Sequence, residues 1–417
     1  MRNNLNLTYK KTFGKKEKPI DFTYSFSGNA GGYNSEADPD AFKNTYTKVS
    51  DNVLRNSVRL NWLVNSIWIT NVEFSASMNY SDKKQTIKTN KSASSTQSAI
   101  HTTEEGYFIA TEYDKNPNAN ILLLPTGYWY ETSYDDDKPV YYTAEIKGKW
   151  SRDFGILRSN FLLGSQFNSS GNYGKGVSYE DMRYAPTYRE FRYDEQPFIN
   201  NISLYAEEKL TFPLFKRELQ LQGGVRYDVI SINGSEYGTV SSLSPRSNMK
   251  YTFIDKGNGF VKNVSIHAGL GDAVKLPSSY ILYPRPSYTD KISFASTTSG
   301  DGTAFYAYYT LPAKPIYNAD LKWQRNRKAE IGIDLNLGGT KISLTAFRDK
   351  IYNPYKSAAS YVPFSYKLTS QSALNDCLIP EQNRVFSIDQ SSGIVTVSDK
   401  TGQLASQQLT SKTQNTF

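Results

Sequence analysis

VYYTAEIKGKW, residues 140–150, alternates apolar and polar side chains without a break. Successive side chains of a β-strand point to opposite faces, so Ala144 and Ile146 share one face while Glu145 and Lys147 share the other. A charged side chain that faces lipid near the middle of a membrane costs about 2–4 kcal/mol. The stretch therefore predicts a strand of a membrane barrel, with the Ile146 face toward lipid and the Glu145 face toward the lumen.

Eleven other stretches repeat this alternation, the clearest of them over about ten residues, which is the length of a membrane-spanning strand. They cover residues 5–9, 20–26, 58–62, 68–80, 157–167, 202–212, 219–229, 246–253, 264–270, 329–337 and 342–351. Glu208 breaks the rule, because parity places it beside Leu204 and Leu210 on the apolar face. Either a β-bulge or a position near the membrane edge would relieve its cost, and both alternatives stay open.

The connections between these stretches alternate as well, short and then long. Short connections cover residues 10–19, 63–67, 151–156, 213–218, 254–259 and 338–341, and long ones cover 27–57, 81–139, 168–201, 230–245 and 271–328, with an open tail after 351. A soluble β-sandwich has no reason to place all its long loops at one end. We therefore predict an all-β chain that forms a transmembrane, antiparallel, up-and-down β-barrel with short periplasmic turns and long extracellular loops.

The composition fits this fold and excludes others. Aromatic residues make up 14% of the 417 residues, while the mean hydropathy is only −0.57. Such a hydrophilic average suits a barrel, because only every second strand residue meets lipid. The longest aliphatic run, at residues 121–124, is far shorter than the roughly 20 residues of a membrane helix. Cys377 is the only cysteine, which excludes an intrachain disulfide.

Charge and histidine content narrow the function. The net charge is +8, but the lysines are interspersed with acidic residues, which argues against nucleic-acid binding. With His101 and His267 as the only histidines, no Ser-His-Asp triad or metal triad can be assembled from the pattern. We expect no enzyme activity, no catalytic residue, no metal and no cofactor.

Residues 200–355 contain short sequence motifs that resemble those of the TonB-dependent outer-membrane receptors. They read LQGGVRYD at 221–228, LSPR at 243–246, KLPS at 275–278, YPRPSYTD at 283–290 and NADLKWQ at 318–324. The last three resemble, more narrowly, the SusC/RagA-like branch of nutrient-uptake receptors. Residues 1–200 agree with the family by their strand pattern only.

The resemblance implies a plugged barrel of about 22 strands that imports oligosaccharides or peptides through a Gram-negative outer membrane. It also implies two protein partners, namely TonB, which acts on the plug, and a SusD-like surface lipoprotein that caps the barrel. On this interpretation residues 1–417 are one part of the barrel domain, with about twelve strands and without a signal peptide, TonB box or plug. Residues 352–417 would be an unfinished extracellular loop, and such a fragment alone is not expected to transport.

Two groups of residues are candidates for function. Aromatic side chains in the long loops would stack on sugar rings or peptide side chains, and these are Tyr128, Trp129, Tyr130, Phe305, Tyr306, Tyr308 and Tyr309. Charged side chains on the lumen side would line the wall and contact a plug, and these are Glu145, Lys147, Arg226 and Asp228. The alternative for the loop aromatics is packing of a large loop on itself or on the lipoprotein.

Two further features favour ordinary structural roles. Trp62, Trp68, Trp150 and Tyr80 lie near strand ends, as expected of a membrane-interface girdle. Residues 135–137 are three consecutive aspartates without the alternating ligand spacing of a calcium loop, so a solvated loop is expected there.

Two other functions remain open. A structural or adhesive surface barrel would insert into membranes without supporting growth on any nutrient. A soluble β-rich carbohydrate-binding protein would be recovered without detergent, so membrane fractionation separates it from the barrel.

Overall fold

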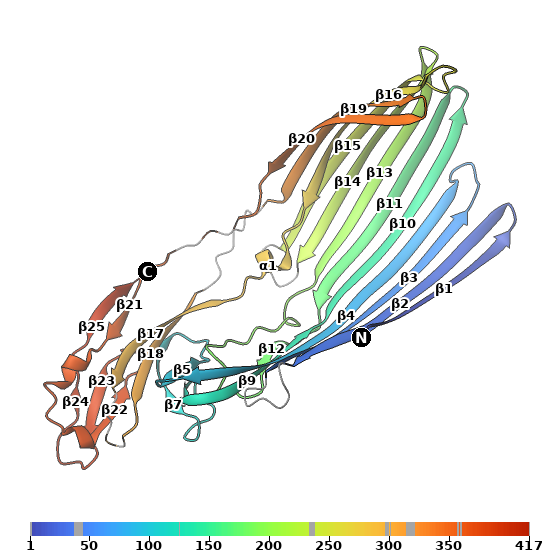
Figure 1. Cartoon of the computed structure of the whole chain (residues 1–417). Helices are drawn as coiled ribbons and strands as arrows, with labels where there is room; N and C mark the ends of the chain where they lie inside the picture. The colour runs from blue at the N-terminus through green and yellow to red at the C-terminus, as the bar shows by residue number, and fades with distance from the viewer. Residues whose placement is uncertain are drawn as a thin grey trace.

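The computed structural model of the chain describes residues 2–36, 45–124, 126–232, 238–296, 300, 302–313, 322–356, 358 and 361–416. Twelve long strands form one antiparallel sheet, in which spatial order follows chain order (Figure 1). They are β1 (Arg2–Lys15), β2 (Lys18–Glu36), β3 (Tyr46–Leu63), β4 (Asn71–Ala93), β10 (Pro139–Phe154), β11 (Leu157–Asn172), β13 (Ile199–Leu214), β14 (Arg217–Ile232), β15 (Gly238–Ile254), β16 (Val261–Lys275), β19 (Gln324–Leu337) and β20 (Thr340–Tyr352). Each predicted stretch lies within one of these strands, residues 68–70 excepted, so the all-β, up-and-down prediction is confirmed.

The sheet has a hairpin end and a loop end. Connections at residues 16–17, 64–70, 155–156, 215–216, 255–260 and 338–339 lie at the hairpin end, and the other connections between consecutive strands of the sheet lie at the opposite end (Figure 1). Gly338 and Gly339 have φ of 56° and 95°, the left-handed backbone that a two-residue hairpin turn requires. Within the described residues, β1 and β20 each pair on one side only, so the sheet does not close into a barrel there.

Connections predicted to be long loops at residues 27–57, 81–139 and 230–245 are mostly strand among the described residues, so those predictions are wrong. In the 27–57 segment the ladder of β2 and β3 continues from Gly28 opposite Leu54 to Glu36 opposite Tyr46. In the 230–245 segment β14 continues to Ile232, and β15 already begins at Gly238. Where a ladder extends beyond lipid, neither face has to be apolar. Backbone pairing then continues without the alternation that marks it in the sequence.

Trp68 lies outside the strand to which alternation assigned it. Asn65 has a left-handed φ of 47°, and its amide donates to the Thr70 carbonyl at 3.0 Å. The Ser66 amide donates to the Ile69 carbonyl at 2.9 Å, which closes a compact turn before β4. The membrane-interface role of Trp68 stays a prediction, and its side chain is exposed.

Glu208 lies in a regular strand. Its ladders with β11 and β14 keep an unbroken register, so the β-bulge alternative is wrong. Glu208 lies opposite Gly223, which has no side chain, and accepts a hydrogen bond from Ser159 Oγ at 2.8 Å. That bond lowers the cost of a carboxylate on the apolar face, and a position near the membrane edge stays a prediction.

Large apolar side chains along the apolar face of the sheet are exposed in the part of the chain that the structure describes. Ile146, Leu204 and Leu344 on this face are 52%, 56% and 70% exposed. A soluble sheet buries at least one apolar face against a second layer. The exposed face therefore fits contact with lipid, as the alternation predicts.

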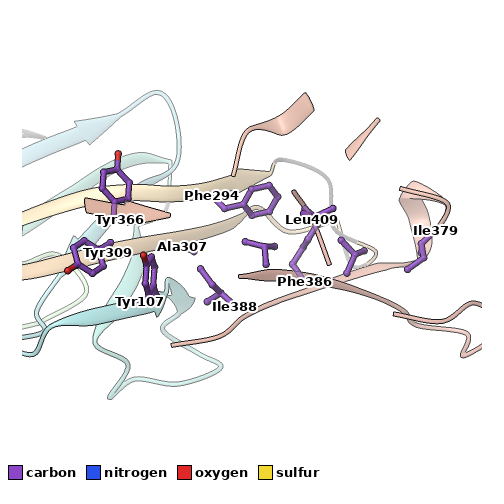
Figure 2. Close-up of a cluster of buried hydrophobic side chains, with 11 residues drawn as sticks. Tyr107, Phe294, Ala307, Tyr309, Tyr366, Ile379, Phe386, Ile388 and Leu409 are labelled. Atoms are coloured by element: carbon purple, nitrogen blue, oxygen red, sulfur yellow. The ribbon is translucent and has the colours of Figure 1, made fainter. Parts of the chain in front are cut away.

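A folded unit, here called the outer module, lies at the loop end and comprises β6, β17, β18 and residues 364–416. β17 (Ser287–Ser296) pairs with β18 (Phe305–Ala313), which pairs with β6 (Gly106–Ile109). The C-terminal part adds β21 (Phe364–Leu368), the 3-10 helices η1 (Gln371–Leu374) and η2 (Glu381–Asn383), β22 (Arg384–Ile388), β23 (Val395–Asp399), β24 (Gln407–Gln408) and β25 (Lys412–Thr416). Its core surrounds Phe294, Phe386 and Ile388 (Figure 2). Although the tail is folded, its interpretation as an unfinished loop stays a prediction.

The remaining elements also lie at the loop end. β5 (Gln97–Ile100), β7 (Thr111–Glu112) and β8 (Ile121–Leu124) form a small sheet, and β9 (Gly127–Asp137) pairs with β4 and β12 (Gly176–Tyr179). The short helix α1 (Ser279–Leu282) follows β16. Among the helices in the described part of the chain, none is long and apolar enough to cross a membrane.

Candidate functional site

A polar network runs over the face of the sheet opposite Ile146, here called the polar face. At its centre Asp228, with a side chain only 6% exposed, accepts hydrogen bonds from Ser203 Oγ at 2.5 Å and Arg226 Nε at 3.0 Å. The Arg226 guanidinium also donates to Gln166 Oε1 at 2.8 Å. Side chains of β11, β13 and β14 are therefore linked across this face.

Tyr205 extends the network across β11, which has a glycine at the position facing the Tyr205 ring. Gly164 of β11 lies between Tyr205 of β13 and Lys147 of β10, and an added Cβ there would lie 2.4 Å from the Tyr205 ring. The bare backbone lets the ring reach across β11. Its hydroxyl donates to Glu145 Oε1 at 2.6 Å, and Glu145 also pairs with Lys147 at 3.2 Å.

Glu73 of β4 is the acidic centre of the other half of the network. Its carboxylate, with a side chain 12% exposed, pairs with Lys147 at 3.2 Å, Lys149 at 2.5 Å and Arg59 at 3.8 Å. Ionic groups of low exposure are stable only when paired in this way. The residues predicted to line the lumen, Glu145, Lys147, Arg226 and Asp228, thus lie on one face and belong to this connected network.

The segment after β16 folds back over the loop end of the polar face. Leu282 of α1 is buried against Ile230 and Ile232, which are the last polar-face positions of β14. Leu276 and Trp323 are among the side chains that pack against this small core. The segment therefore narrows the space in front of the polar face at the strand ends.

An aromatic cleft of about 510 Å³ lies between this segment and the ends of β10 and β11. Arg285 lies over the ring of Phe191 at 5.0 Å and donates to the hydroxyl of Tyr193 at 3.3 Å. Tyr141, which is exposed, and Tyr283 also line the cleft. Aromatic rings beside a guanidinium can stack on a flat group and hydrogen-bond its polar edge. The cleft is thus suited to a sugar ring or a peptide side chain.

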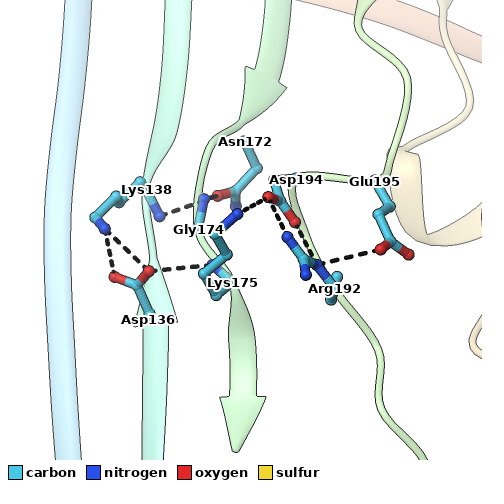
Figure 3. Close-up of polar contacts among 8 residues, drawn as sticks. All are labelled: Asp136, Lys138, Asn172, Gly174, Lys175, Arg192, Asp194 and Glu195. Carbon is cyan, nitrogen blue, oxygen red and sulfur yellow. Dashed lines mark hydrogen bonds and ion pairs between the residues drawn. The ribbon is translucent and has the colours of Figure 1, made fainter.

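Ion pairs hold the loop that contributes Phe191 and Tyr193 to the cleft. Asp194 accepts hydrogen bonds from Arg192 at 2.8 Å and Lys175 at 2.5 Å (Figure 3). These bonds, first that from Arg192 and then that from Lys175, hold the pKa of Asp194 well below its usual range. The Asp194 carboxylate therefore stays charged at neutral pH, and its ion pairs with Arg192 and Lys175 are kept.

A second contact in the same view fixes the loop to β9. Asp136 pairs with Lys138 at 2.8 Å, and its Oδ2 accepts the amide of Lys175 at 3.1 Å (Figure 3). Asn172 Oδ1 accepts the amides of Lys138 and Gly174. The expectation of a solvated loop at residues 135–137 is wrong, because these residues end a paired strand and Asp136 has a cationic partner.

Arg189 joins three connections near the cleft. Its guanidinium, with a side chain 8% exposed, donates to the carbonyls of Thr102 and Ile100 at 2.8 Å and 3.0 Å. It also donates to Asp290 Oδ1 at 2.7 Å. The connections β4–β10, β11–β13 and β16–β19 are therefore fixed to one another rather than separate.

The first group of predicted aromatics lies in a strand rather than in a loop. Tyr128, Trp129 and Tyr130 belong to β9, which pairs with β4. Trp129 stacks on Tyr184 at 5.9 Å between ring centroids, and Lys88 lies over the ring of Tyr130 at 4.5 Å. The loop assignment is wrong because a long connection can form strands of its own.

The second group belongs to β18 and packs into protein cores. Phe305 and Tyr309 pack in the core of the outer module, while Tyr306 and Tyr308 pack against the core around Ile121. Burial raises the pKa of Tyr309 to about 12, and a 2.8 Å hydrogen bond to Glu105 adds to the effect. Substrate contact by any of the seven aromatics stays a prediction.

The aromatic cleft was not recognised in the sequence. Tyr141 had a usable signal, because alternation places it on the Glu145 side near the loop end of its strand. Phe191 and Tyr193 lie in an irregular connection, and only the folded chain brings them to Tyr283 and Arg285. Within the described ranges, no group of three or more His, Cys, Asp or Glu side chains is placed to hold a metal ion.

Comparisons with known proteins agree with this geometry. The family model described as "TonB dependent receptor-like, beta-barrel" matches residues 1–372. A search of the curated proteins found no match.

A search of the solved structures also returned matches. The RagAB peptide transporter has 10% sequence identity and a TM-score of 0.45, over 83% of this chain and 40% of that chain. The siderophore receptor PirA from Pseudomonas aeruginosa has 14% identity and a TM-score of 0.34, over 95% and 61% of the two chains. The chain thus spans two fifths of the RagAB chain and three fifths of PirA.

Proposed function

Because the chain belongs to the TonB-dependent receptor-like β-barrel family, we propose that it forms part of the wall of an importer of large nutrients. Barrels of this family reside in the Gram-negative outer membrane. The proposed cargo is an oligosaccharide or a peptide. The loop end of the sheet would face the cell exterior, and the hairpin end the periplasm.

The polar network opposite an apolar face is the observation that carries this proposal. The apolar side chains around Ile146 suit lipid, while the paired charges around Arg226 and Asp228 suit water or a plug domain. Backbone groups inside such a wall are paired between strands, as a membrane requires. The polar face would then line the import path, with Glu145 and Lys147 at its surface.

The aromatic cleft supports cargo binding at the outer entrance of that path. Tyr141, Tyr193 and Arg285 combine stacking surfaces with hydrogen-bond donors at the loop end of the polar face. Among the predicted loop aromatics, Tyr128 is the exposed one and remains a proposed second contact. A contact from each ring would contribute about two- to tenfold in affinity.

The proposed partners are TonB, acting through a plug domain, and a SusD-like lipoprotein on the outer surface. The SusC/RagA-like phrases at residues 275–290 and 318–324 support the second partner. The outer module lies at the loop end (Figure 1), where such a lipoprotein would dock. Co-purification of a surface lipoprotein with the tagged native protein from solubilised outer membranes would test this part.

A growth experiment tests the importer proposal. The gene is deleted in its own bacterium, and growth is measured on oligosaccharides, peptides, and their monomers as matched controls. We expect growth to be lost on one polymer class and kept on the monomers. Complementation with Y193A or R285A should restore growth only at raised nutrient concentration, whereas the exposed-site control L378A should restore it fully.

Three outcomes would contradict the proposal. Unimpaired growth of the deletion strain on every polymer would remove the import function. Membrane insertion without any growth phenotype would favour the structural or adhesive barrel. Recovery of the native protein in the soluble fraction without detergent would favour the carbohydrate-binding protein.

A further inference from the structure

Cationic side chains gather on the apolar face of the sheet near its loop end. The register of β19 and β20 places Arg325, Arg327, Arg348 and Lys350 on the same side as Ile331. We call these four residues the cationic cluster. Its position is unexpected, because a charge on this face is costly wherever the face meets hydrocarbon.

The cluster has more positive charge than its acidic partner neutralises. Asp272 of β16, with a side chain 4% exposed, accepts two hydrogen bonds from Arg327 at 2.8 Å and 3.0 Å. Arg325 lies 3.4 Å from the same carboxylate. With Arg348 and Lys350, four cations and one carboxylate leave a net charge of +3 on this part of the face.

A cleft of about 650 Å³ opens beside Arg325 and Arg327. Half of the residues that line it are apolar or aromatic, and they include Tyr227, Leu243, Val274, Trp323 and Tyr352. Lys322 adds a further cation to its wall. The cleft thus offers an apolar surface and several positive charges to one ligand.

The cations give way to an aliphatic band toward the hairpin end. Ile331, Leu344 and Ile342 on the same face are all exposed. Ile331 lies four positions after Arg327, which is roughly 13 Å along a strand. In a membrane with the loop end outward, the band would lie at the depth of acyl chains and the cluster at the depth of lipid headgroups, where Lys and Arg attract anionic lipids.

We propose that the cationic cluster binds the phosphate groups of an outer-leaflet lipid whose acyl chains lie along the aliphatic band. The charge excess supplies the attraction, and the cleft beside Arg325 supplies room for the headgroup. The proposal requires a membrane around the sheet with the loop end outward. It does not depend on which nutrient is transported.

The test measures lipid binding by the whole chain in nonionic detergent, by native mass spectrometry at about 0.1 M salt. The probes are a bisphosphorylated glucosamine-based glycolipid, the same glycolipid without its phosphates, and inorganic phosphate. The variant R348Q/K350Q keeps the Asp272 ion pairs intact. Each surface cation contributes about fivefold in affinity, so we expect a loss of roughly 25-fold.

K328Q is the matched control. Lys328 lies in β19 but on the polar face, where it pairs with Asp349 at 3.8 Å. The control should bind the phosphorylated glycolipid like the native chain. A second variant, R327Q, should lose about fivefold and tests the cleft side of the cluster.

Several results would overturn the proposal. One is equal binding by R348Q/K350Q and the native chain, and another is equal binding of the glycolipid with and without its phosphates. If inorganic phosphate bound as tightly as the phosphorylated glycolipid, the cluster would be an anion site and not a lipid site. Binding that stays constant as salt rises would also contradict it, because exposed charges are screened.

Discussion

The long sheet and the outer module place their apolar side chains in opposite ways. On the sheet, Ile146 and Leu344 are more than half exposed, whereas Phe294, Val395 and Val397 of the outer module are completely buried. The sheet has a polar network where a soluble domain would have its core. The module has an aromatic core where loops were expected.

This difference indicates two separate sources of stability within one chain. The sheet depends on lipid for its apolar face and on closure of its backbone pairs. The module buries its own side chains and needs only water around it. A perturbation of one region should therefore leave the other largely intact.

Phe294→Ala should give the largest effect and confine it to the module. Phe294 contacts Phe305 and Phe386 at centroid distances of 5.9 Å and 5.4 Å, and truncation of a buried Phe costs about 3–5 kcal/mol. Thermal melting by near-ultraviolet circular dichroism and limited proteolysis of residues 364–416 measure the loss. Leu378→Ala, at an exposed site of the module, should change the melting free energy by less than about 0.5 kcal/mol.

If Phe294→Ala unfolded the sheet as well as the outer module, the two regions would not be stabilised independently. The sheet is followed by the shift in gel mobility on heating that folded barrels show. An unchanged shift with a melted module is the expected result.

Ile146→Lys should affect the sheet and spare the module. A lysine on the lipid side near mid-membrane costs about 2–4 kcal/mol, so insertion into lipid vesicles should fall strongly. Thr143→Lys places the same charge on the polar face of the same strand and should insert normally. The reverse outcome would remove the assignment of the two faces on which the importer proposal depends.

Gly164→Ala sharpens the description of the polar network. The new methyl group would meet the Tyr205 ring at 2.4 Å, so the ring must move away from Glu145, at about 1–3 kcal/mol for overpacking. Urea unfolding in vesicles measures the change. Gly223→Ala is the matched control, because a Cβ there meets nothing within 4 Å. Equal stability of the two variants would show that Tyr205 does not need the bare backbone of β11.

Alkaline pH should give the smallest effect, and only in the module. Burial and the hydrogen bond to Glu105 raise the pKa of Tyr309 to about 12, so neutral Tyr309 stabilises the module fully below its unfolded pKa of about 10. That stability is lost as pH rises from about 10 through 12. Module melting followed between pH 9 and 12 should show the loss, and Tyr309→Phe should flatten the profile. A profile unchanged by Tyr309→Phe would assign the effect to other groups.

The twelve strands and their faces were readable because alternation is a local signal. Arg226 and Asp228 stand two residues apart, so any extended conformation puts them on one side. Their hydrogen bonds to Ser203 and Gln166 depend on strand register, which no local pattern specifies. The reach of Tyr205 over Gly164 was hidden for the same reason.

The loop end was predicted less well than the sheet. The lengths of the connections indicated at which end of the sheet they lie. Their sequences did not indicate which strands and cores they form. Phe305 and Tyr309 are candidates either for substrate contact or for packing within the loop, and the structure places both in a core, because a long connection can bury its own aromatics. Phe191 and Arg285 come together across almost a hundred residues of chain, so their cleft has no sequence signature.

The sequence alone determined which face of each strand is apolar and suited to lipid. The reason is that every charged side chain placed in lipid costs free energy at its own position, so the alternation appears within each strand. Folding in three dimensions set how far the ladders run past the lipid, which loops pack together and where the cleft opens. Backbone hydrogen bonds are common to all residues except proline, and long-range packing depends on side chains far apart in the chain. Neither backbone pairing nor long-range packing produces a periodic pattern in the sequence.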